Sequence, residues 1–233
     1  MKYVISDIHG EYELFCSLLN CIDFSEDDSL FICGDIIDKG KQSVRLAKHI
    51  SKMNNVYCII GNHELAFLKY YHSILQNSPE DFDEVLKRLQ SYFPNDGYLL
   101  DWDLVDWFES LPAYIEEDEF ICVHAGLPID DFGYLCSPSK ISVEHLVHDR
   151  KFKEPEIVHC SQKCVFFGHT ETDCICGENL ILGYRRNNIL IPKTVKDYYK
   201  IHLDTGAWSK GILGCFCIDT LNVFYVNKAN NKR

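Results

Sequence analysis

The sequence has no run of apolar residues long enough to cross a lipid bilayer, and its charge balance is not basic. Its first ten residues, MKYVISDIHG, become polar at once, unlike a signal peptide, so we expect a cytoplasmic protein with no membrane partner. The formal net charge is −12, from 35 acidic and 23 basic side chains. Nucleic-acid-binding modules are normally basic, because phosphate neutralisation dominates their affinity. We therefore expect no nucleic-acid partner.

A disulfide framework is not indicated either, although the chain has 12 cysteines. Disulfide-rich chains are short and secreted, whereas 233 residues suffice for one large domain with its own core. Most cysteines stand inside apolar runs, as Cys33, Cys58 and Cys122 do, and we interpret them as buried free thiols. Four later cysteines match no common zinc spacing: Cys160, Cys164, Cys174 and Cys176.

Short apolar runs alternate with amphipathic segments in the first third of the chain. The runs 2–6, 29–33 and 55–60 are β-rich and predict buried strands. Segments 11–22 and 43–53 repeat apolar residues at helical spacing, so strands and helices alternate and indicate a parallel or mixed sheet. More strands are predicted later in the chain, at 119–126, 163–170, 200–206, 214–219 and 222–227.

The late strands predict a second sheet that packs on the first. We therefore expect one α/β domain over residues 1–233, with two packed mixed β-sheets as a central sandwich flanked by helices. The stretch from about 64 to 119 is predicted to be a largely helical insert, with a break at 95–97. The locally basic segment 183–200 is interpreted as a solvated hairpin, with a substrate lid as the alternative.

Polar clusters follow five of the predicted strands. They are SDIHG (6–10), GDIIDKG (34–40), GNHE (61–64), VHAGLP (123–128) and GHT (168–170). One such cluster alone is typical of a turn or a helix cap, but five beside glycines are not. Ligands gather at the carboxyl ends of strands in open α/β sheets, so we expect the clusters to meet. Their donors are carboxylates, imidazoles and an amide oxygen, which suit manganese, iron or zinc.

In order and spacing, these clusters resemble those of the calcineurin-like metallophosphoesterase superfamily, especially its PPP serine/threonine phosphatase branch. The resemblance covers nearly the whole chain and includes SLPAYIEE (110–117) and LDTGAWSKG (203–211). It implies the calcineurin-like fold. It also implies hydrolysis of phosphomonoesters by in-line attack of a hydroxide that bridges two divalent metal ions, manganese first and iron or zinc as alternatives.

The resemblance also implies a set of metal ligands. Asp7 and His9 would bind the first ion, and Asp35 would bridge both ions. Because residues two apart in an extended segment point the same way, Asp7 and His9 can indeed reach one ion together. The second site would be completed by Asn62, His124 and His169.

Catalysis and phosphate binding are assigned by the same resemblance. His63 would protonate the departing oxygen, and Asp38 would orient its imidazole and keep it basic. Phosphate would be bound by Asn62, Lys39 and Arg150. The family usually has arginine at the position of Lys39, and lysine lacks the bidentate fork, so we expect a less rigid grip on phosphate. The alternative for Arg150 is a surface salt bridge.

Two residues decide the expected branch. Symmetrical diadenosine tetraphosphate hydrolases typically have alanine at the position of Asp38 and aspartate at that of Glu64. We therefore expect a serine/threonine protein phosphatase that acts on phosphorylated protein. The alternatives are a symmetrical diadenosine tetraphosphate hydrolase or another small-molecule phosphoesterase and, from a different class, a non-catalytic scaffold that binds phosphorylated partners.

Overall fold

A computed structural model of the chain describes residues 1–76, 84, 87, 102–186 and 189–228. The described strands form two five-stranded sheets. In the first sheet the order is β10-β9-β1-β2-β3, with β1, β2 and β3 parallel and β9 antiparallel to both of its neighbours, β1 and β10. Its strands are β1 (Lys2–Ile5), β2 (Ser29–Ile32), β3 (Val56–Cys58), β9 (Ile212–Cys217) and β10 (Val223–Asn227).

The second sheet has the order β4-β5-β6-β8-β7, in which β5, β6 and β8 are parallel and the two edge strands are antiparallel. Its strands are β4 (Tyr114–Glu116), β5 (Phe120–Val123), β6 (Cys164–Phe167), β7 (Leu182–Arg185) and β8 (Tyr198–His202). The mixed character of both sheets agrees with the sequence prediction. Each sheet has three parallel strands whose carboxyl ends share one edge.

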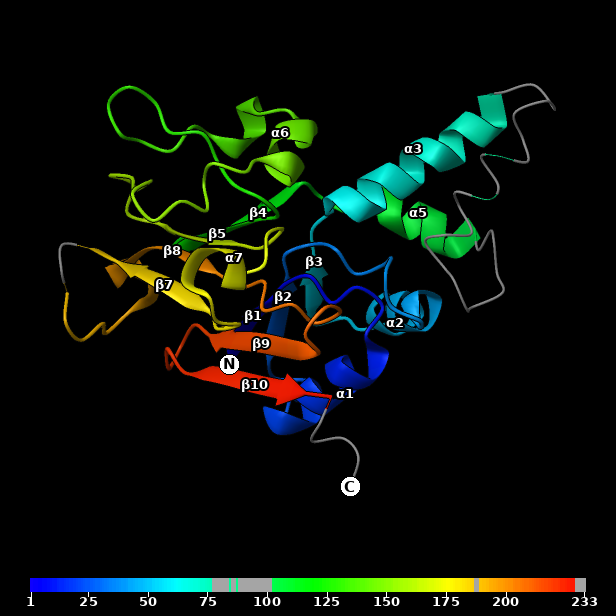
Figure 1. The fold of residues 1–233 in the computed structure, drawn as a ribbon, viewed down its shortest axis with the longest axis horizontal. Coiled ribbons are helices and arrows are strands. Elements are labelled where there is room, and N and C mark those ends of the chain that lie inside the picture. Colours follow the sequence, from blue (N-terminus) through cyan, green and yellow to red (C-terminus); the bar gives the residue numbers. More distant parts are fainter. Residues whose placement is uncertain (77–83, 85–86, 88–101, 187–188, 229–233) are drawn as a thin grey trace.

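Helices surround the two sheets (Figure 1). They are α1 (Tyr12–Cys21), α2 (Ser43–Ile50), α3 (Asn62–Gln76), α5 (Trp102–Ser110), α6 (Val143–His148) and α7 (Asp173–Cys176), with 3-10 turns η1 (Pro138–Lys140) and η3 (Val195–Asp197). Helices α3 and α5 lie side by side and project from the sandwich, joined by Phe67 and Phe108 with ring centroids 5.7 Å apart. No helix of the described residues is long and apolar enough to cross a membrane.

Alternating side chains build the layers. In β1, Tyr3 and Ile5 pack against the helices on the outer face, whereas Val4 faces the second sheet. The space between the sheets is filled by aromatic rings, with Phe120 5.2 Å from Phe31 between ring centroids. Three of the buried cysteines belong to this layer: Cys33, Cys122 and Cys164. The predicted sandwich of two packed sheets is confirmed.

The predicted helical insert is only partly described. Helices α3 and α5 lie inside the range 64–119, and the predicted break at 95–97 lies outside the described residues. Strand β4 corrects the helical prediction for its end, because Tyr114–Glu116 pairs antiparallel with β5. Three residues at a sheet edge are too few to give a clear alternating pattern. In the segment 183–200, β7 and β8 pair antiparallel, as a hairpin requires.

Candidate metal and phosphate site

The five polar clusters meet where the parallel strands of both sheets end. Backbone hydrogen bonds join their loops, from Asp7 N to Gly34 O (3.2 Å), from His9 N to Asp35 O (2.9 Å) and from Gly168 N to His124 O (2.8 Å). The last of these joins two loops of the second sheet, and the first two join loops of the first sheet. The strands therefore bring together six predicted ligands: Asp7, His9, Asp35, Asn62, His124 and His169.

The loop backbones are held in an unusual conformation. Asp7, His9, Asp35 and His169 all have positive φ, between 49° and 72°. Residues other than glycine adopt this region at a cost, and such strain concentrates at functional sites. The neighbouring glycines allow close approach, because a Cβ at Gly168 would lie 2.0 Å from Asp7 Oδ2. The strained backbone at these four residues directs their side chains toward one another.

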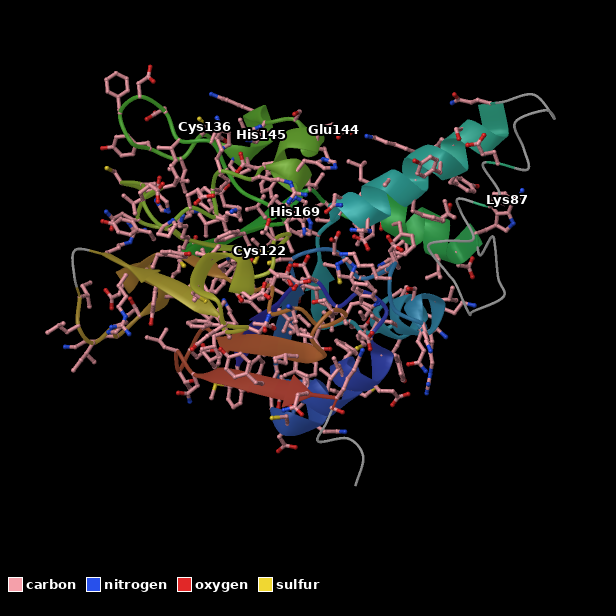
Figure 2. The ribbon with its side chains drawn as sticks, in the orientation of Figure 1. Lys87, Cys122, Cys136, Glu144, His145 and His169 are labelled. Atoms are coloured by element: carbon pink, nitrogen blue, oxygen red, sulfur yellow. The ribbon has the colours of Figure 1, made fainter. Side chains whose placement is uncertain are left out.

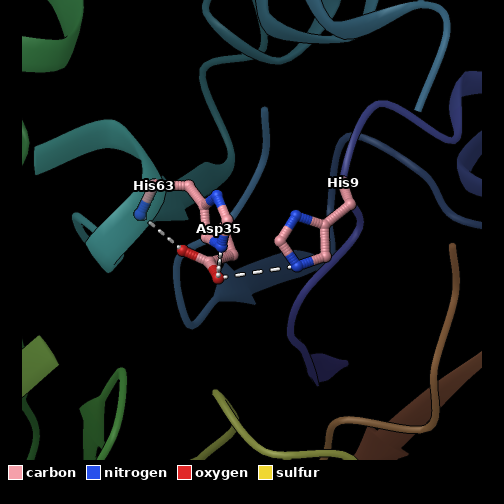
Figure 3. Close-up of side chains that lie close together, drawn as sticks. All are labelled: His9, Asp35 and His63. Atoms are coloured by element: carbon pink, nitrogen blue, oxygen red, sulfur yellow. Dashed lines mark hydrogen bonds and ion pairs between the residues drawn. The ribbon is translucent and has the colours of Figure 1, made fainter. Parts of the chain in front are cut away.

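One group of candidate ligands consists of His9, Asp35 and His63 (Figure 3). Asp35 Oδ2 lies 3.5 Å from His9 Nε2 and 3.6 Å from His63 Nε2. The His9 Nδ1–H donates to the carbonyl oxygen of Ile37 at 3.1 Å, which leaves Nε2 as the ligand atom. Asp7 Oδ1 is 4.0 Å from the same nitrogen. Asp7 and His9 therefore face a common point.

A second group consists of Asp35, His124 and His169. Asp35 Oδ1 lies 3.4 Å from His124 Nε2, while His124 Nδ1–H donates to the Cys33 carbonyl at 2.8 Å. Asn62 Oδ1 is 2.9 Å from His124 Nε2 and 2.8 Å from His169 Nδ1. His169 lies between α6 and the N-terminal end of α3 (Figure 2). Asp35 alone belongs to both groups, and each of its oxygens faces a different one.

The charges of this cluster suit divalent cations. Burial, and then the negative charge of Asp35, raise the pKa of Asp7 to about 8, and burial also raises that of Asp35. Burial lowers the pKa of His9 and His124 and brings that of His169 to about 3, so all three imidazoles are neutral. Neutral imidazoles bind metals, and buried neighbouring carboxylates gain most when cations offset their charge. The oxygen and nitrogen donors fit two such ions.

His63 and Asp38 form a close pair beside the cluster. The His63 Nδ1–H donates to Asp38 Oδ2 at 2.6 Å, which leaves Nε2 facing Asp35. Burial opposes ionisation of Asp38, but hydrogen bonds from His63 and from the Lys39 backbone outweigh it and lower the pKa of this carboxyl. An ionised partner fixes the tautomer of His63. The pairing predicted for these two residues is present.

The two predicted cationic residues line the same cavity, but only Lys39 has a close contact with a predicted metal ligand. Lys39 Nζ is 3.0 Å from His9 Nε2, so its ammonium stands directly against the cluster. Arg150 is exposed, makes no ion pair with any residue that the structure describes, and lines a cavity together with His9, Lys39 and His169. The cavity measures about 370 Å³. At the edge of this cavity the Arg150 guanidinium can contact an anion, and the part of the chain that the structure describes shows no salt bridge for it.

Glu64 has a role that the sequence did not reveal. Its buried carboxylate accepts four backbone N–H bonds, from Asp35 (3.0 Å), Ile36 (2.8 Å), Ile37 (3.0 Å) and Gly61 (2.9 Å). It thereby holds the loop after β2 against the loop after β3. In the sequence Glu64 differs only in length from the aspartate of a related motif, and nothing in the local pattern indicates which backbone groups it meets.

Further residues near the cluster were not singled out from the sequence. The ring centroid of His148 lies 6.2 Å from that of His169, and Trp208 and Lys210 line the same cavity as Arg150. His148 follows no recognisable motif. Trp208 and Lys210 belong to LDTGAWSKG (203–211), a segment that resembles one of the family but does not by itself indicate what these two side chains contact.

The sequence of this chain is similar to known proteins of one family. A model of the family described as "Calcineurin-like phosphoesterase" matches residues 3–188. A symmetrical bis(5'-nucleosyl)-tetraphosphatase of Wigglesworthia glossinidia brevipalpis is 30% identical over 158 residues, which are 65% of this chain and 54% of that protein. The corresponding enzyme of Salmonella paratyphi C is 30% identical over 129 residues, or 54% and 43% of the two chains. The chain thus spans about half the length of the curated relatives it matches.

Solved structures share the fold at low sequence identity. One of them is described as the "Crystal structure of a putative diadenosine tetraphosphatase". It has a TM-score of 0.65 at 18% identity, and the match covers 97% of this chain and 92% of that one. A cold-active protein-tyrosine phosphatase of a Shewanella species has a TM-score of 0.55 at 15% identity, covering 97% and 80%. These likenesses show the fold alone. Since the family model covers residues 3–188, the chain belongs to the calcineurin-like phosphoesterase family.

Proposed function

We propose that this metallophosphoesterase hydrolyses a small nucleotide of the dinucleoside polyphosphate class. The observation that carries the chemistry is the pair of ligand groups joined through Asp35. The substrate class is supported by the curated relatives, which are symmetrical dinucleoside tetraphosphatases. The sequence-based preference for a protein phosphatase is therefore not maintained as the first choice.

Of the two residues that suggested a protein phosphatase, only Glu64 has a purely structural explanation. Among the described residues Glu64 binds backbone N–H groups alone, so its extra methylene relative to aspartate concerns how two loops are held. Asp38 is different, because it orients His63 toward the cluster. That pair favours a second candidate, a phosphomonoesterase acting on phosphorylated protein, since an alkoxide leaving group needs a proton whereas a nucleoside diphosphate leaves readily as an anion.

The chain's residues divide the work as follows. Asp7, His9 and Asp35 would hold one cation, and Asp35 would share a second with Asn62, His124 and His169. Two divalent cations, manganese first and iron or zinc as alternatives, would supply Lewis acidity and an activated water there.

The remaining polar residues act on the phosphoryl group and the leaving group. Lys39 and Arg150 offset charge on the phosphoryl oxygens. His63 acts as the doubly protonated imidazolium: Asp38 accepts its Nδ1–H and stabilises the cation, so that Nε2–H donates the proton that a poor leaving group requires.

The two candidates are separated by their products. The manganese-loaded protein is incubated with diadenosine tetraphosphate and, separately, with a phosphoserine peptide, and the products are identified by chromatography. ADP release with an inert peptide supports the proposal. Phosphate release from the peptide with an intact dinucleotide supports the phosphatase. Binding of either compound without turnover, with metal content verified, indicates the non-catalytic scaffold.

A further inference from the structure

An exposed tryptophan lines the cavity beside the metal ligands, and nothing in the proposed chemistry uses it. Trp208 leaves 47% of its surface exposed and shares the cavity with His9, Lys39 and Arg150. Other strongly exposed aromatic residues of the described chain, such as Phe132 and Trp102, do not line this cavity. Trp208 is therefore an aromatic surface within the same hollow as the phosphate-directed groups.

The loop that carries Trp208 is firmly held. Lys210 N donates to Gly206 O at 2.8 Å, and Gly206 N donates to Asp204 Oδ1 at 3.1 Å. Thr205 Oγ1 donates to Ile212 O at 2.9 Å and accepts from Gly214 N at 2.9 Å, which fastens the loop to β9. An aromatic ring on such a loop loses little conformational freedom when it binds a flat ligand.

The side chains around the cavity are chemically complementary to a nucleotide. Lys39, Arg150 and Lys210 line the cavity as three cations, and Lys210 is paired with Asp173 at 2.7 Å. The carboxylates of Glu171 and Asp204 also line it, so the unpaired positive charge is that of Lys39 and Arg150. A volume of about 370 Å³ lies in the range of small-ligand pockets. Phosphates prefer the cationic and metal-ligating part, while a purine or pyrimidine ring can stack on an indole face, which is the usual sequence-tolerant way to bind a base.

We propose that Trp208 is the stacking platform for one nucleobase of the substrate, which makes a nucleoside phosphate the ligand of this cavity. The proposal rests on the proposed function for the phosphate end of the ligand. It adds the group that distinguishes a nucleotide from an inorganic or peptide phosphate. A phosphopeptide has no base to place on Trp208, so stacking also discriminates between the two candidate substrates.

Binding of two probes to the manganese-loaded protein tests the platform. The probes are ADP, which has a base, and pyrophosphate, which has none, and both affinities are measured by titration calorimetry. Trp208→Ala should weaken ADP binding by about 5- to 100-fold, the usual range for loss of one base–aromatic stack, and leave pyrophosphate binding unchanged. Trp208→Phe should restore most of the ADP affinity. Trp102→Ala, at an exposed tryptophan outside the cavity, is the matched control.

Each other outcome has a defined meaning. Unchanged ADP affinity in Trp208→Ala overturns the platform, and equal weakening of ADP and pyrophosphate overturns it too, because that pattern indicates a disturbed loop. Hydrolysis of diadenosine tetraphosphate by the wild-type protein is measured in parallel. If the dinucleotide is inert but the ADP-specific loss is observed, the platform stands and the proposed substrate is wrong.

Discussion

Imidazole orientation is set residue by residue at this site. Nδ1 of His9 and of His124 is bound to a backbone carbonyl, and Nδ1 of His63 is bound to Asp38. In each case the other nitrogen points at Asp35. Fixing one ring nitrogen determines the tautomer at the other. The three histidines thus differ in the group that their Nδ1 binds. We assign proton transfer to His63 because its partner is a carboxylate, whereas His9 and His124 are assigned to metal binding.

His63→Asn tests that distinction. Asparagine cannot carry the proton, so turnover of a phosphoserine peptide or an alkyl phosphate should fall by about a hundred- to ten-thousandfold, the usual contribution of general acid catalysis. Hydrolysis of diadenosine tetraphosphate should fall much less, because its leaving group is a stable anion. The measurement is kcat on both substrates. His72→Asn, at an exposed histidine outside the site, is the control. Equal losses on both substrates would contradict the acid role.

A buried histidine that belongs to neither ligand group leads to a prediction about pH. His159 Nε2–H donates to Tyr199 O at 2.7 Å, and burial lowers the pKa of its ring from 6.5 to about 4. The unfolded chain therefore takes up this proton below pH 6.5 and the folded chain only near pH 4, so the free energy of unfolding falls as pH drops through that window. The loss is about 3 kcal/mol at 1.4 kcal/mol per pKa unit.

Replacing His159 by glutamine should remove that part of the acid sensitivity. The amide can still donate to Tyr199 O, but it does not titrate. Urea unfolding at several pH values between 4 and 7 should show a flatter profile for His159→Gln than for the wild type. His72→Gln should keep the wild-type slope. An unchanged slope in His159→Gln would show that other groups carry the acid sensitivity.

The sequence predicted much of the site at the scale of the residue and missed what depends on backbone arrangement. Because the polar clusters follow predicted parallel strands, the sequence alone predicts that Asp7, Asp35 and His169 lie close together. Glu64 was read only as a family marker, since its four bonds go to main-chain groups that lie 27 to 29 positions away or in its own turn. Trp208 was likewise passed over. Side-chain-to-backbone contacts between loops leave no periodic or compositional signal.

Helix α3 acts as a unit that delivers three polar residues from its first turn. Asn62 contacts both second-group histidines, His63 pairs with Asp38, and Glu64 holds the loop after β2. Further along the helix, Phe67 packs against Phe108 of α5. A shift of the N-terminal end of α3 would therefore displace Asn62, His63 and Glu64 together.

Glu64→Gln should separate scaffolding from chemistry at the start of α3. Glutamine has one carbonyl oxygen and presents an NH₂ group to two of the four N–H donors, so those donors lose their acceptor. We expect a loss of about 3 kcal/mol in the free energy of unfolding, together with weaker metal binding because Asp35 shifts. Urea unfolding and metal titration measure the two effects. Glu109→Gln, which breaks an exposed pair with His72, should cost less than about 1 kcal/mol.

Element prediction succeeded where long periodic segments pack on a sheet and failed at an edge. Strands β1 and β2 and helices α1 and α2 follow the predicted ranges, because one face of each is continuously apolar. Strand β4 was predicted as part of a helical stretch. Its residues are only partly buried, and its strand conformation depends on pairing with β5, which the local sequence does not encode.

The whole molecule brings two separate sheets to one pair of ligand groups. The first sheet supplies Asp7, His9 and Asp35, and the second supplies His124 and His169, so the centre straddles the sandwich. Cations bound there stabilise only the folded chain, because the unfolded chain does not assemble the ligands. Metal content, stability and the contact between the sheets are therefore linked quantities.

Asp35→Asn is the variant that tests this linkage. The wild type should bind about two manganese ions per chain, and free ion at a hundred times Kd should raise the free energy of unfolding by about 2.7 kcal/mol per site. Because Asp35 belongs to both groups, its substitution should lower both occupancies and remove most of that stabilisation. His9→Ala, at a residue that belongs to the first group and not to the second, should weaken one ion only. Elemental analysis and urea unfolding with and without manganese measure these effects.

The contradicting outcome is the loss of a single ion in Asp35→Asn while the other ion is bound as tightly as before. That result would show that the Asp35 carboxylate binds one ion only and does not link the ligands of the two sheets.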